Sequence, residues 1–464
     1  MKLNTPSIFV ASLAASASAN TAAPTVSLPY ARYQGFHNST SGLDVFLGIS
    51  VYTPPLSSKK KGLPVLVWIH GGGYFFGDAA SYDPTAMLQA SGHSFVAVII
   101  QYRLGVFGFL PGSEVKKNGA LNAGLLDIQF ALEWTRENIH LFGGDPEKVT
   151  IWGESAGGGA VLIQAVAHGG KTSPALFKHG IASSPYLTPS YSEAVDTLAC
   201  LRDVDQTTLV TEDTGEPRPV VDGTLLLERP QLSLEKKQVN GELLISLHNN
   251  DEGGLFVTRN TSSTVRSWVV QQYPHLSQSN VTAIEDAYQI FASSNATEAD
   301  NIYQMQKMIL AEAIFVCPSI WLADAFSGVS YKGLFSVPPA LHGLDLAVYF
   351  PEIGYSFIQP AQPISQSLTE SFMGALISFI VTGSPNNNPM NKILNPYWEI
   401  YDPMDPKSMD FNITASGTAD PELKKVDFSL LQRCRQVNID PLKYLHPKLT
   451  IPSLWGALAP FTRQ

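Results

Sequence analysis

The stretch that most constrains the fold is Val149–Gly159, which reads V-T-I-W-G-E-S-A-G-G-G. A β-branched and aromatic run leads into a Gly-Glu-Ser-Ala-Gly turn, and Ala160–Ala167 then has the composition of a buried helix. A strand, a sharp turn and a helix form the context in which G-x-S-x-G makes a nucleophile elbow, with Ser155 at a strained backbone position. In a chain with 36 glycines the pentapeptide alone is equally consistent with an incidental turn, so the rest of the chain has to decide.

The segments around this turn alternate between strand and helix patterns. Leu63–His70 and Ser94–Ile100 are continuous apolar runs, which are typical of strands buried on both faces. Asn122–Ile139 has apolar residues at helical spacing and precedes the elbow. Further strands are expected at Leu243–Leu247 and Leu334–Val337, and further helices at 281–293, 300–327 and 368–381. The pattern predicts an α/β fold with a mostly parallel central sheet and helices on both faces.

The domain organisation follows from the ends of the chain and from its continuity. Met1 and Lys2, a short apolar core and Ala17-Ser18-Ala19 predict a signal peptide over residues 1–19. No repeat, low-complexity tract or linker divides the remainder, so residues 20–464 are expected to form a single domain. No later apolar run is long enough to predict a transmembrane segment.

A serine hydroxyl becomes a good nucleophile only when a base takes its proton and an acid orients that base. In α/β-hydrolases the chain order is nucleophile, acid and histidine, each after a strand. Asp251 and Glu252 both follow the Leu243–Leu247 strand, and the pattern does not separate them. Either carboxylate can serve as the acid.

Three histidines remain downstream of these carboxylates, namely His275, His342 and His446. His342 follows the predicted Leu334–Val337 strand, whereas no strand precedes His275 and His446 lies in a Pro-rich tail. His342 is therefore the predicted base.

An oxyanion hole is the third requirement of acyl transfer, because backbone N–H groups must meet the carbonyl oxygen as it becomes negative. His70-Gly71-Gly72-Gly73 lies at the end of the Val65–Ile69 strand and has the H-G-G-G pattern for this role. Gly72 and Gly73, together with Ala156, are the predicted donors. With Ser155 and His342 in the right order, these parts indicate a serine hydrolase.

Charge and sequons restrict the setting in which such an enzyme works. The net charge is −10 and the pI is about 5.5, which argues against nucleic acid or an anionic membrane as a partner. Five N-x-S/T sequons behind a signal peptide predict a secreted, extracellular glycoprotein. These sequons lie at Asn38, Asn260, Asn280, Asn295 and Asn412.

The cysteines and the chemistry leave two questions open. Cys200, Cys317 and Cys434 form an odd set, which implies a free thiol, an intermolecular bond or a missing partner, and their pairing is not determined. Serine chemistry needs no metal and no organic cofactor, so none is expected. The oligomeric state is not indicated by the sequence.

The chain resembles the type-B carboxylesterase/lipase family, the cholinesterase-like branch of the α/β-hydrolases. The resemblance implies Ser155 as nucleophile, Glu252 rather than Asp251 as acid, and His342 as base. It assigns the oxyanion hole to Gly72, Gly73 and Ala156. Glu154 matches the family's acidic residue near the catalytic pocket, which makes it a candidate substrate-binding residue. The matching stretches are Leu63–Gly77, Gln101–Leu110, Asn122–Leu125, Phe142–Pro146, Val149–Gly159, Arg218–Gly223, Asn250–Gly254 and His342–Gly343.

The chain departs from the family pattern at three places. Phe46–Ser50 runs straight into Val51–Pro54, which implies that the N-terminal edge strands are partly missing together with a disulfide-closed loop. Cys200 resembles the second member of a pair whose first member is absent, and the connection from Leu209 to Arg218 is short. These gaps imply either a trimmed enzyme with an open pocket or a truncated or mis-spliced chain.

The sequence thus predicts a secreted serine hydrolase that cleaves small-molecule or lipid carboxylic esters through an acyl-enzyme intermediate. Two alternatives remain. The chain is an inactive, truncated or mis-spliced family member, or it is a non-catalytic cholinesterase-like binding protein. Ester type and acyl chain length are not indicated, because the altered regions are the ones that line the pocket.

Overall fold

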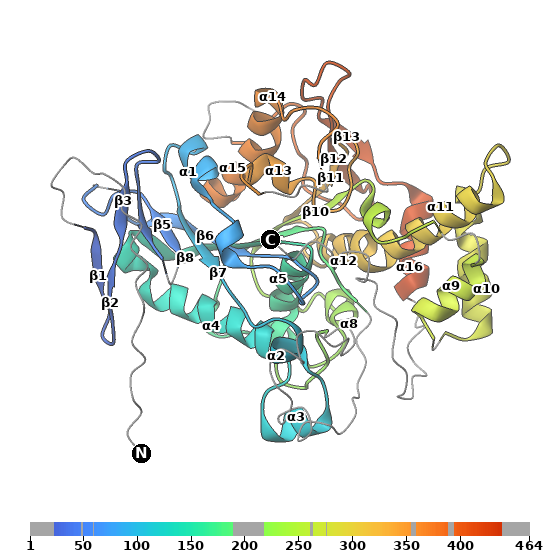
Figure 1. The fold of residues 1–464 in the computed structure, drawn as a ribbon, viewed down its shortest axis with the longest axis horizontal. Helices are drawn as coiled ribbons and strands as arrows, with labels where there is room; N and C mark the ends of the chain where they lie inside the picture. The colour runs from blue at the N-terminus through green and yellow to red at the C-terminus, as the bar shows by residue number, and fades with distance from the viewer. Residues whose placement is uncertain are drawn as a thin grey trace.

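The centre of the fold is an 11-stranded sheet in the order β13-β12-β11-β10-β9-β8-β6-β7-β5-β4-β3, seen within the described residues (Figure 1). The computed structural model describes residues 23–47, 50–58, 60–188, 218–259, 263–274, 276–353, 359–387 and 394–438. The strands from β12 to β7 pair in parallel, and antiparallel strands flank them at both edges. The strand bounds are β3 Phe36–Asn38, β4 Leu43–Phe46, β5 Val51–Thr53, β6 Leu63–Ile69, β7 Val96–Ile100, β8 Gly144–Glu154, β9 His179–Ser183, β10 Leu243–Asn249, β11 Ser330–Phe335, β12 Lys407–Phe411 and β13 Glu422–Lys425.

The parallel strands are buried on both faces, as their continuous apolar sequences predict. Along β6, Val65 and Val67 join one core cluster while Leu66 and Trp68 join the other, and all four side chains are fully buried. Successive side chains of a strand point to opposite faces, so a strand inside the sheet needs apolar residues at every position. The predicted fold class, a mostly parallel sheet with helices on both faces, is confirmed.

Helices cover the two faces of the sheet in separate groups (Figure 1). Helices α4, α5, α8 and α12 pack on one face, and α1, α13 and α15 pack on the other. Helices α9, α10 and α11 extend from one end of the sheet with a small apolar cluster of their own. The helix bounds are α1 Thr85–Ala90, α2 Gly105–Phe109, α3 Ser113–Asn118, α4 Ala123–Asn138, α5 Ala156–Val166, α8 Pro230–Glu235, α9 Val265–Gln272, α10 Gln278–Tyr288, α11 Glu298–Ala311, α12 Cys317–Ala325, α13 Leu346–Tyr349, α14 Gln366–Leu368, α15 Gly374–Thr382 and α16 Phe428–Asn438.

Short elements complete the fold. A separate hairpin of two strands precedes the sheet, and single turns of 3-10 or π-helix extend several of the helices. The hairpin strands are β1 Thr25–Ser27 and β2 Arg32–Gln34; the 3-10 turns are η1 Ala79–Ser81, η2 Ile139–Phe142, η3 Ala167–Gly169, η4 Glu252–Leu255 and η5 Gln289–Phe291; the π turns are η6 Glu312–Val316 and η7 Thr369–Met373.

The strand before His342 lies earlier than the sequence pattern predicts. The expected strand was Leu334–Val337, whereas β11 spans Ser330–Phe335. The apolar run identified only the end of the strand, because its first half carries Ser330 and Lys332, which are buried all the same. A strand with buried polar side chains is missed when strands are predicted from hydrophobicity.

The N-terminal edge of the sheet is continuous. The resemblance implied that edge strands are partly missing, and the structure has three short ones, β3, β4 and β5, of three or four residues each. β4 pairs with β5, and β5 pairs in turn with β7 of the parallel sheet. The strands on either side of the abbreviated place in the sequence, β4 and β5, are therefore adjacent and antiparallel.

One helix in the described part of the chain is long and apolar enough to cross a membrane. It runs from Glu298 to Ala325 through α11, the π turn η6 and α12, close to the predicted 300–327. Of its most apolar 18-residue stretch, 78% is buried inside the fold, where α12 packs on β10 and β11. This burial is that of a core helix in a globular domain.

A disulfide joins Cys317 at the start of α12 to Cys434 in α16. The sequence left the pairing of the three cysteines open. Cys200, the predicted signal peptide at 1–19 and the shortened connection from Leu209 to 217 lie outside the described residues.

Candidate active site

Ser155 lies between the end of β8 and the first residue of α5. Its backbone angles are φ 56° and ψ −122°, a conformation that non-glycine residues rarely adopt. Its N–H donates to the Ser183 carbonyl at 3.0 Å. A Cβ atom at position 157 would lie 2.0 Å from the Ile69 carbonyl oxygen, so only glycine lets α5 pack this closely on β6.

Glu252 opens the 3-10 turn η4, just after β10. Its Oε1 accepts the Asn249 N–H at 2.6 Å and the Ser184 hydroxyl at 2.7 Å. The residue is 1% exposed. Two donors from the ends of β10 and β9 therefore hold the carboxylate in one orientation.

The loop that carries His342 is attached to the loop that carries Glu252. Asp251 and Leu341 form a parallel bridge, and the Asp251 N–H donates to the Ala340 carbonyl at 2.8 Å. Two residues far apart in the chain thus reach the same edge of the sheet.

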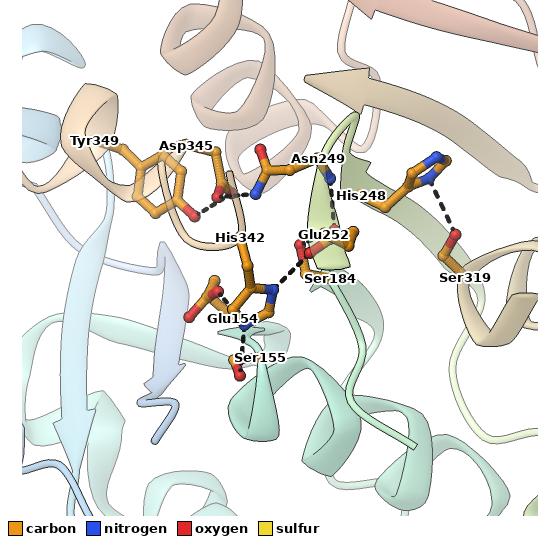
Figure 2. A network of polar contacts seen from close by, with 10 residues as sticks. All are labelled: Glu154, Ser155, Ser184, His248, Asn249, Glu252, Ser319, His342, Asp345 and Tyr349. Carbon is orange, nitrogen blue, oxygen red and sulfur yellow. Dashed lines mark hydrogen bonds and ion pairs between the residues drawn. The ribbon is translucent and has the colours of Figure 1, made fainter. Parts of the chain in front are cut away.

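The three side chains form a continuous hydrogen-bonded line (Figure 2). His342 Nε2 lies 2.9 Å from Ser155 Oγ, and His342 Nδ1 lies 2.5 Å from Glu252 Oε2. Asp251, the other candidate acid, contacts the Lys307 ammonium at 3.1 Å instead. Of the two neighbouring carboxylates, only Glu252 contacts His342.

Charges around the imidazole shift its proton affinity. Burial lowers the pKa of His342, but the charge of Glu252 and the hydrogen bond that Glu252 accepts act in the opposite direction, and the net pKa is raised. This arrangement suits a base that accepts a proton and holds it as an imidazolium next to a carboxylate.

Glu154, the residue before the serine, is a second carboxyl next to the imidazole. It is 3% exposed, and its Oε1 lies 3.4 Å from His342 Nε2. Burial raises the pKa of Glu154 to about 8, and the charges of Asp345 and Glu252 add to the effect. Asp345, whose pKa burial also raises, accepts hydrogen bonds from Asn249 and Tyr349 (Figure 2).

The glycine loop lies against the serine turn. A Cβ atom on Gly71 would meet Glu154 Oε2 at 2.9 Å and Ser155 Cβ at 3.0 Å. Gly72 and Gly73 both have positive φ, 102° and 63°. Among the described residues, no protein acceptor is recorded for the N–H groups of Gly72, Gly73 or Ala156.

Two aromatic rings pack on His342. The ring centroid of Phe315 lies 4.2 Å from that of the imidazole, and the Phe256 centroid lies at 5.1 Å. Phe315 belongs to the π turn η6, whose Ile314 carbonyl accepts the Leu187 N–H at 2.9 Å. These rings exclude water from one side of the histidine.

The sequence pattern did not identify Ser184, Asn249, Phe256, Phe315 or Asp345. Asn249 follows the core of a predicted strand, so its position at the edge that carries the site was a usable signal. The strand before Ser184, β9, was not predicted. Phe315 gave no such signal, because its place depends on how a long helix crosses the sheet.

The other predicted site residues lie at the surface or outside the described residues. Asn295 is exposed, and Asn38, Asn280 and Asn412 are partly exposed. Asn260, His275 and His446 are not among the described residues. Among those that are, no group of three or more His, Cys, Asp or Glu side chains could hold a metal ion.

Sequence comparison relates the chain to lipases and carboxylesterases. The model of the "Carboxylesterase family" matches residues 37–193 and 189–429. A secreted lipase of Arthroderma benhamiae is 30% identical over 376 residues, which cover 73% of this chain and 71% of the relative. The secreted triacylglycerol lipase LIP1 of Gibberella zeae is 34% identical over 296 residues, covering 54% and 50%. Carboxylesterase patB of Aspergillus clavatus is 29% identical over 401 residues, covering 78% and 70%.

Solved structures share the fold. Aspergillus niger EstA superposes with a TM-score of 0.77 at 24% identity, over 90% of this chain and 98% of that one. Geobacillus stearothermophilus carboxylesterase EST55 gives 0.71 at 22% identity, over 89% and 99%. At these identities the likeness establishes the arrangement of the sheet and helices alone.

Proposed function

The chain belongs to the carboxylesterase family and is a carboxylic ester hydrolase, and on that premise we propose that Ser155, His342 and Glu252 are its catalytic triad. One observation carries the proposal. The line from Ser155 Oγ through both nitrogens of His342 to Glu252 Oε2 has distances of 2.9 and 2.5 Å. Nucleophile, base and acid are thus all within hydrogen-bonding reach.

In the first step Ser155 Oγ attacks the ester carbonyl carbon while its proton moves to His342 Nε2. Glu252 holds the Nδ1 proton of the imidazole and stabilises the imidazolium that forms. The tetrahedral intermediate then collapses: the carbon–oxygen bond to the alcohol breaks, and His342 gives its proton to the departing oxygen. Ser155 is left acylated.

In the second step water takes the place of the alcohol. His342 removes a proton from the water, the hydroxyl attacks the acyl carbon, and the carboxylic acid leaves as the proton returns to Ser155 Oγ. No metal or redox group is needed to balance either step.

We assign the oxyanion hole to the N–H groups of Gly72, Gly73 and Ala156. The carbonyl oxygen becomes negative in both tetrahedral intermediates, and each aligned donor contributes on the order of 10²–10³ in rate. The support is that the glycine loop lies against the serine turn and that these N–H groups have no recorded acceptor in the described part of the protein. Ala156 also starts α5, whose N-terminal dipole favours negative charge.

Glu154 is assigned to the substrate-binding wall beside Ser155. Its carboxyl lies next to the position where the alcohol oxygen receives its proton, 3.4 Å from His342 Nε2. At neutral pH burial keeps the carboxyl mostly protonated, since its pKa is raised to about 8. A neutral acid at this place avoids a second negative charge near the oxyanion.

The setting proposed is extracellular. Two of the relatives described above are named as secreted lipases, and the chain begins with a segment that has the features of a signal peptide. Lipases and a carboxylesterase both occur among the relatives, so the substrate class proposed is the carboxylic ester, with lipid esters included.

A fluorophosphonate probe tests the proposal, because it reacts only with an activated serine. The folded wild-type protein is expected to become labelled and to lose its activity towards p-nitrophenyl esters, whereas Ser155→Ala takes up no label. Absence of label on the folded wild-type chain would favour a non-catalytic binding protein or an inactive family member.

A further inference from the structure

Lys332 is a buried lysine of β11 that takes no part in the steps above. The residue is 1% exposed, and its ammonium donates to His248 Nδ1 and to the Gly333 carbonyl, both at 2.7 Å. Among the described residues no carboxylate forms an ion pair with it. A buried cation without a contacting anion is costly to the folded state, so its presence requires an explanation.

His248 holds the ammonium without neutralising it. Nδ1 accepts the hydrogen bond from Lys332, so the ring proton of the neutral histidine lies on Nε2. Burial and the charge of Lys332 both hold the pKa of His248 far below its usual value. The Ser319 hydroxyl of α12 also lies 3.2 Å from Nδ1 (Figure 2), but it donates to the Val316 carbonyl at 2.7 Å.

The pair is connected to the proposed catalytic acid through β10 and β11. His248 precedes Asn249, whose N–H donates to Glu252 Oε1 at 2.6 Å. Lys332 lies on the neighbouring strand, where β10 and β11 pair in parallel with Ser246 opposite Lys332. Burial lowers the pKa of Lys332 to about 7, and the charge of Glu252 opposes that shift, so the two groups interact electrostatically.

Buried carboxyl groups outnumber basic side chains around His342, and Glu252 is the one in direct contact with Nδ1 of its ring. Three buried carboxyl groups, those of Glu154, Glu252 and Asp345, surround the single imidazole of His342. The acidic groups on α12 and β12, the elements that contact β11, have partners of their own. Asp324 of α12 interacts with Tyr401, and Asp410 of β12 pairs with Lys424 at 2.7 Å.

We propose that Lys332 is a positioning residue of the active site, whose ammonium, held by His248, is the buried counter-charge of the Glu252 carboxylate. The inference rests on the proposed triad. In this arrangement the cation opposes protonation of the Glu252–His342 pair, so that the imidazole is free to act as a base at lower pH than it otherwise would be. The buried charge of Lys332 destabilises the folded state, but it extends the pH range of activity toward acid.

The test is the pH profile of kcat/KM for Lys332→Met in the full chain. Methionine fills the space of the lysine stem without its charge, so the midpoint of the acid limb is expected to rise by on the order of half a pH unit. Lys307→Met is the matched control. Its ammonium lies beside Asp251, the residue next to Glu252, but that charge is already paired, and its midpoint is expected to stay in place.

Urea unfolding separates this role from a merely structural one. The Lys332→Met variant is expected to unfold at a urea midpoint close to that of the wild type, because the cost of burying the charge is removed together with its two hydrogen bonds. A lowered unfolding midpoint with an unchanged acid limb would overturn the proposal. If the methionine variant does not fold, Lys332→Gln gives the same comparison and keeps a donor for His248. Failure of the triad itself is recognised separately, because the wild type would then take up no fluorophosphonate.

Discussion

At the scale of single residues, the environment of His342 predicts how its proposed acid partner acts. Glu252→Gln keeps the shape of the side chain but removes the charge that raises the pKa of His342. We expect kcat to fall by about 10⁴-fold, because the amide no longer fixes the imidazole tautomer or stabilises the imidazolium. The residual activity should have an acid limb at lower pH than the wild type. Steady-state kinetics from pH 5 to pH 9 measure both effects.

Asp251→Asn is the control for this change. Asp251 is next to Glu252 in the chain, but its carboxylate contacts Lys307. Its side chain is also partly exposed, so kcat should change by less than about tenfold. Equal losses in the two variants would contradict the assignment of Glu252 as the acid.

The raised pKa of the single residue Glu154 predicts that the free energy of unfolding depends on pH. Its pKa is raised by burial to about 8, whereas in the unfolded chain it is ordinary. Between about pH 4.5 and pH 8 the folded state therefore binds more protons at this site, and the free energy of unfolding falls as pH rises. Glu154→Gln removes that dependence, so its stability relative to the wild type is expected to increase from pH 5 to pH 8.

Urea unfolding at the two pH values measures this difference. Glu352→Gln, a change at an exposed carboxylate, provides the control and should shift neither midpoint by much. A Glu154→Gln variant with the same difference from the wild type at both pH values would show that the carboxyl is not buried as an acid.

The sequence predicted some residues of the site better than others for physical reasons. Ser155 and the glycines are fixed by local backbone geometry, which leaves a motif of a few adjacent letters. Asp251 and Glu252 are neighbours with the same chemistry, and only the direction of each side chain at the start of η4 separates them. Lys332 gave no signal, because a lysine in a strand normally indicates an exposed position.

At the scale of elements, the disulfide joins α16, the last described helix, to α12, which directly follows the π turn η6 that carries Phe315. Cys434 and Cys317 are 117 residues apart, and closing a loop of that length in the unfolded chain corresponds to about 4–5 kcal/mol. Next to it Arg433 forms a buried ion pair with Glu312 at 2.7 Å, in the same π turn as Phe315. The contact of α16 with η6 therefore supports the ring that packs on His342.

Cys434→Ser is expected to lower the free energy of unfolding by about 4 kcal/mol, or somewhat less if the unfolded chain keeps residual structure. Urea titrations with and without reductant measure the effect. Reductant should bring the wild type to the stability of the variant and leave the variant unchanged. A wild type that is insensitive to reductant under unfolding conditions would contradict the bond.

The alternation of strands and helices was predictable, whereas some boundaries were not. Continuous apolar runs identified β6, β7 and β10, because strands inside a parallel sheet are apolar at every position. β11 begins with residues that hydrophobicity does not reveal. The short N-terminal edge is joined to the sheet by the pairing of β5 with β7, which are distant in the chain. The residues that are missing relative to the family pattern therefore did not predict whether the remaining edge strands would pair.

At the scale of the whole molecule, the proposed extracellular location can be tested through its covalent consequences. A disulfide between α12 and α16 is typical of an oxidising compartment, and relatives of the chain are named as secreted lipases. Expressed in a eukaryotic host with its own N-terminus, the protein is expected in the medium without residues 1–19. Peptide-N-glycosidase F should reduce its mass, because Asn295 is exposed on the loop before α11.

Asn295→Gln isolates one glycan from the others, since it should remove one step from the mass ladder of partly digested protein. Asn301→Gln is the control, an asparagine in α11 that is not part of a sequon. The Asn301→Gln protein should keep every step of the mass ladder that the wild type shows. Protein that stays in the cells with Met1 intact and shows no response to the glycosidase would contradict secretion, while leaving the assignment of the triad to the fluorophosphonate experiment.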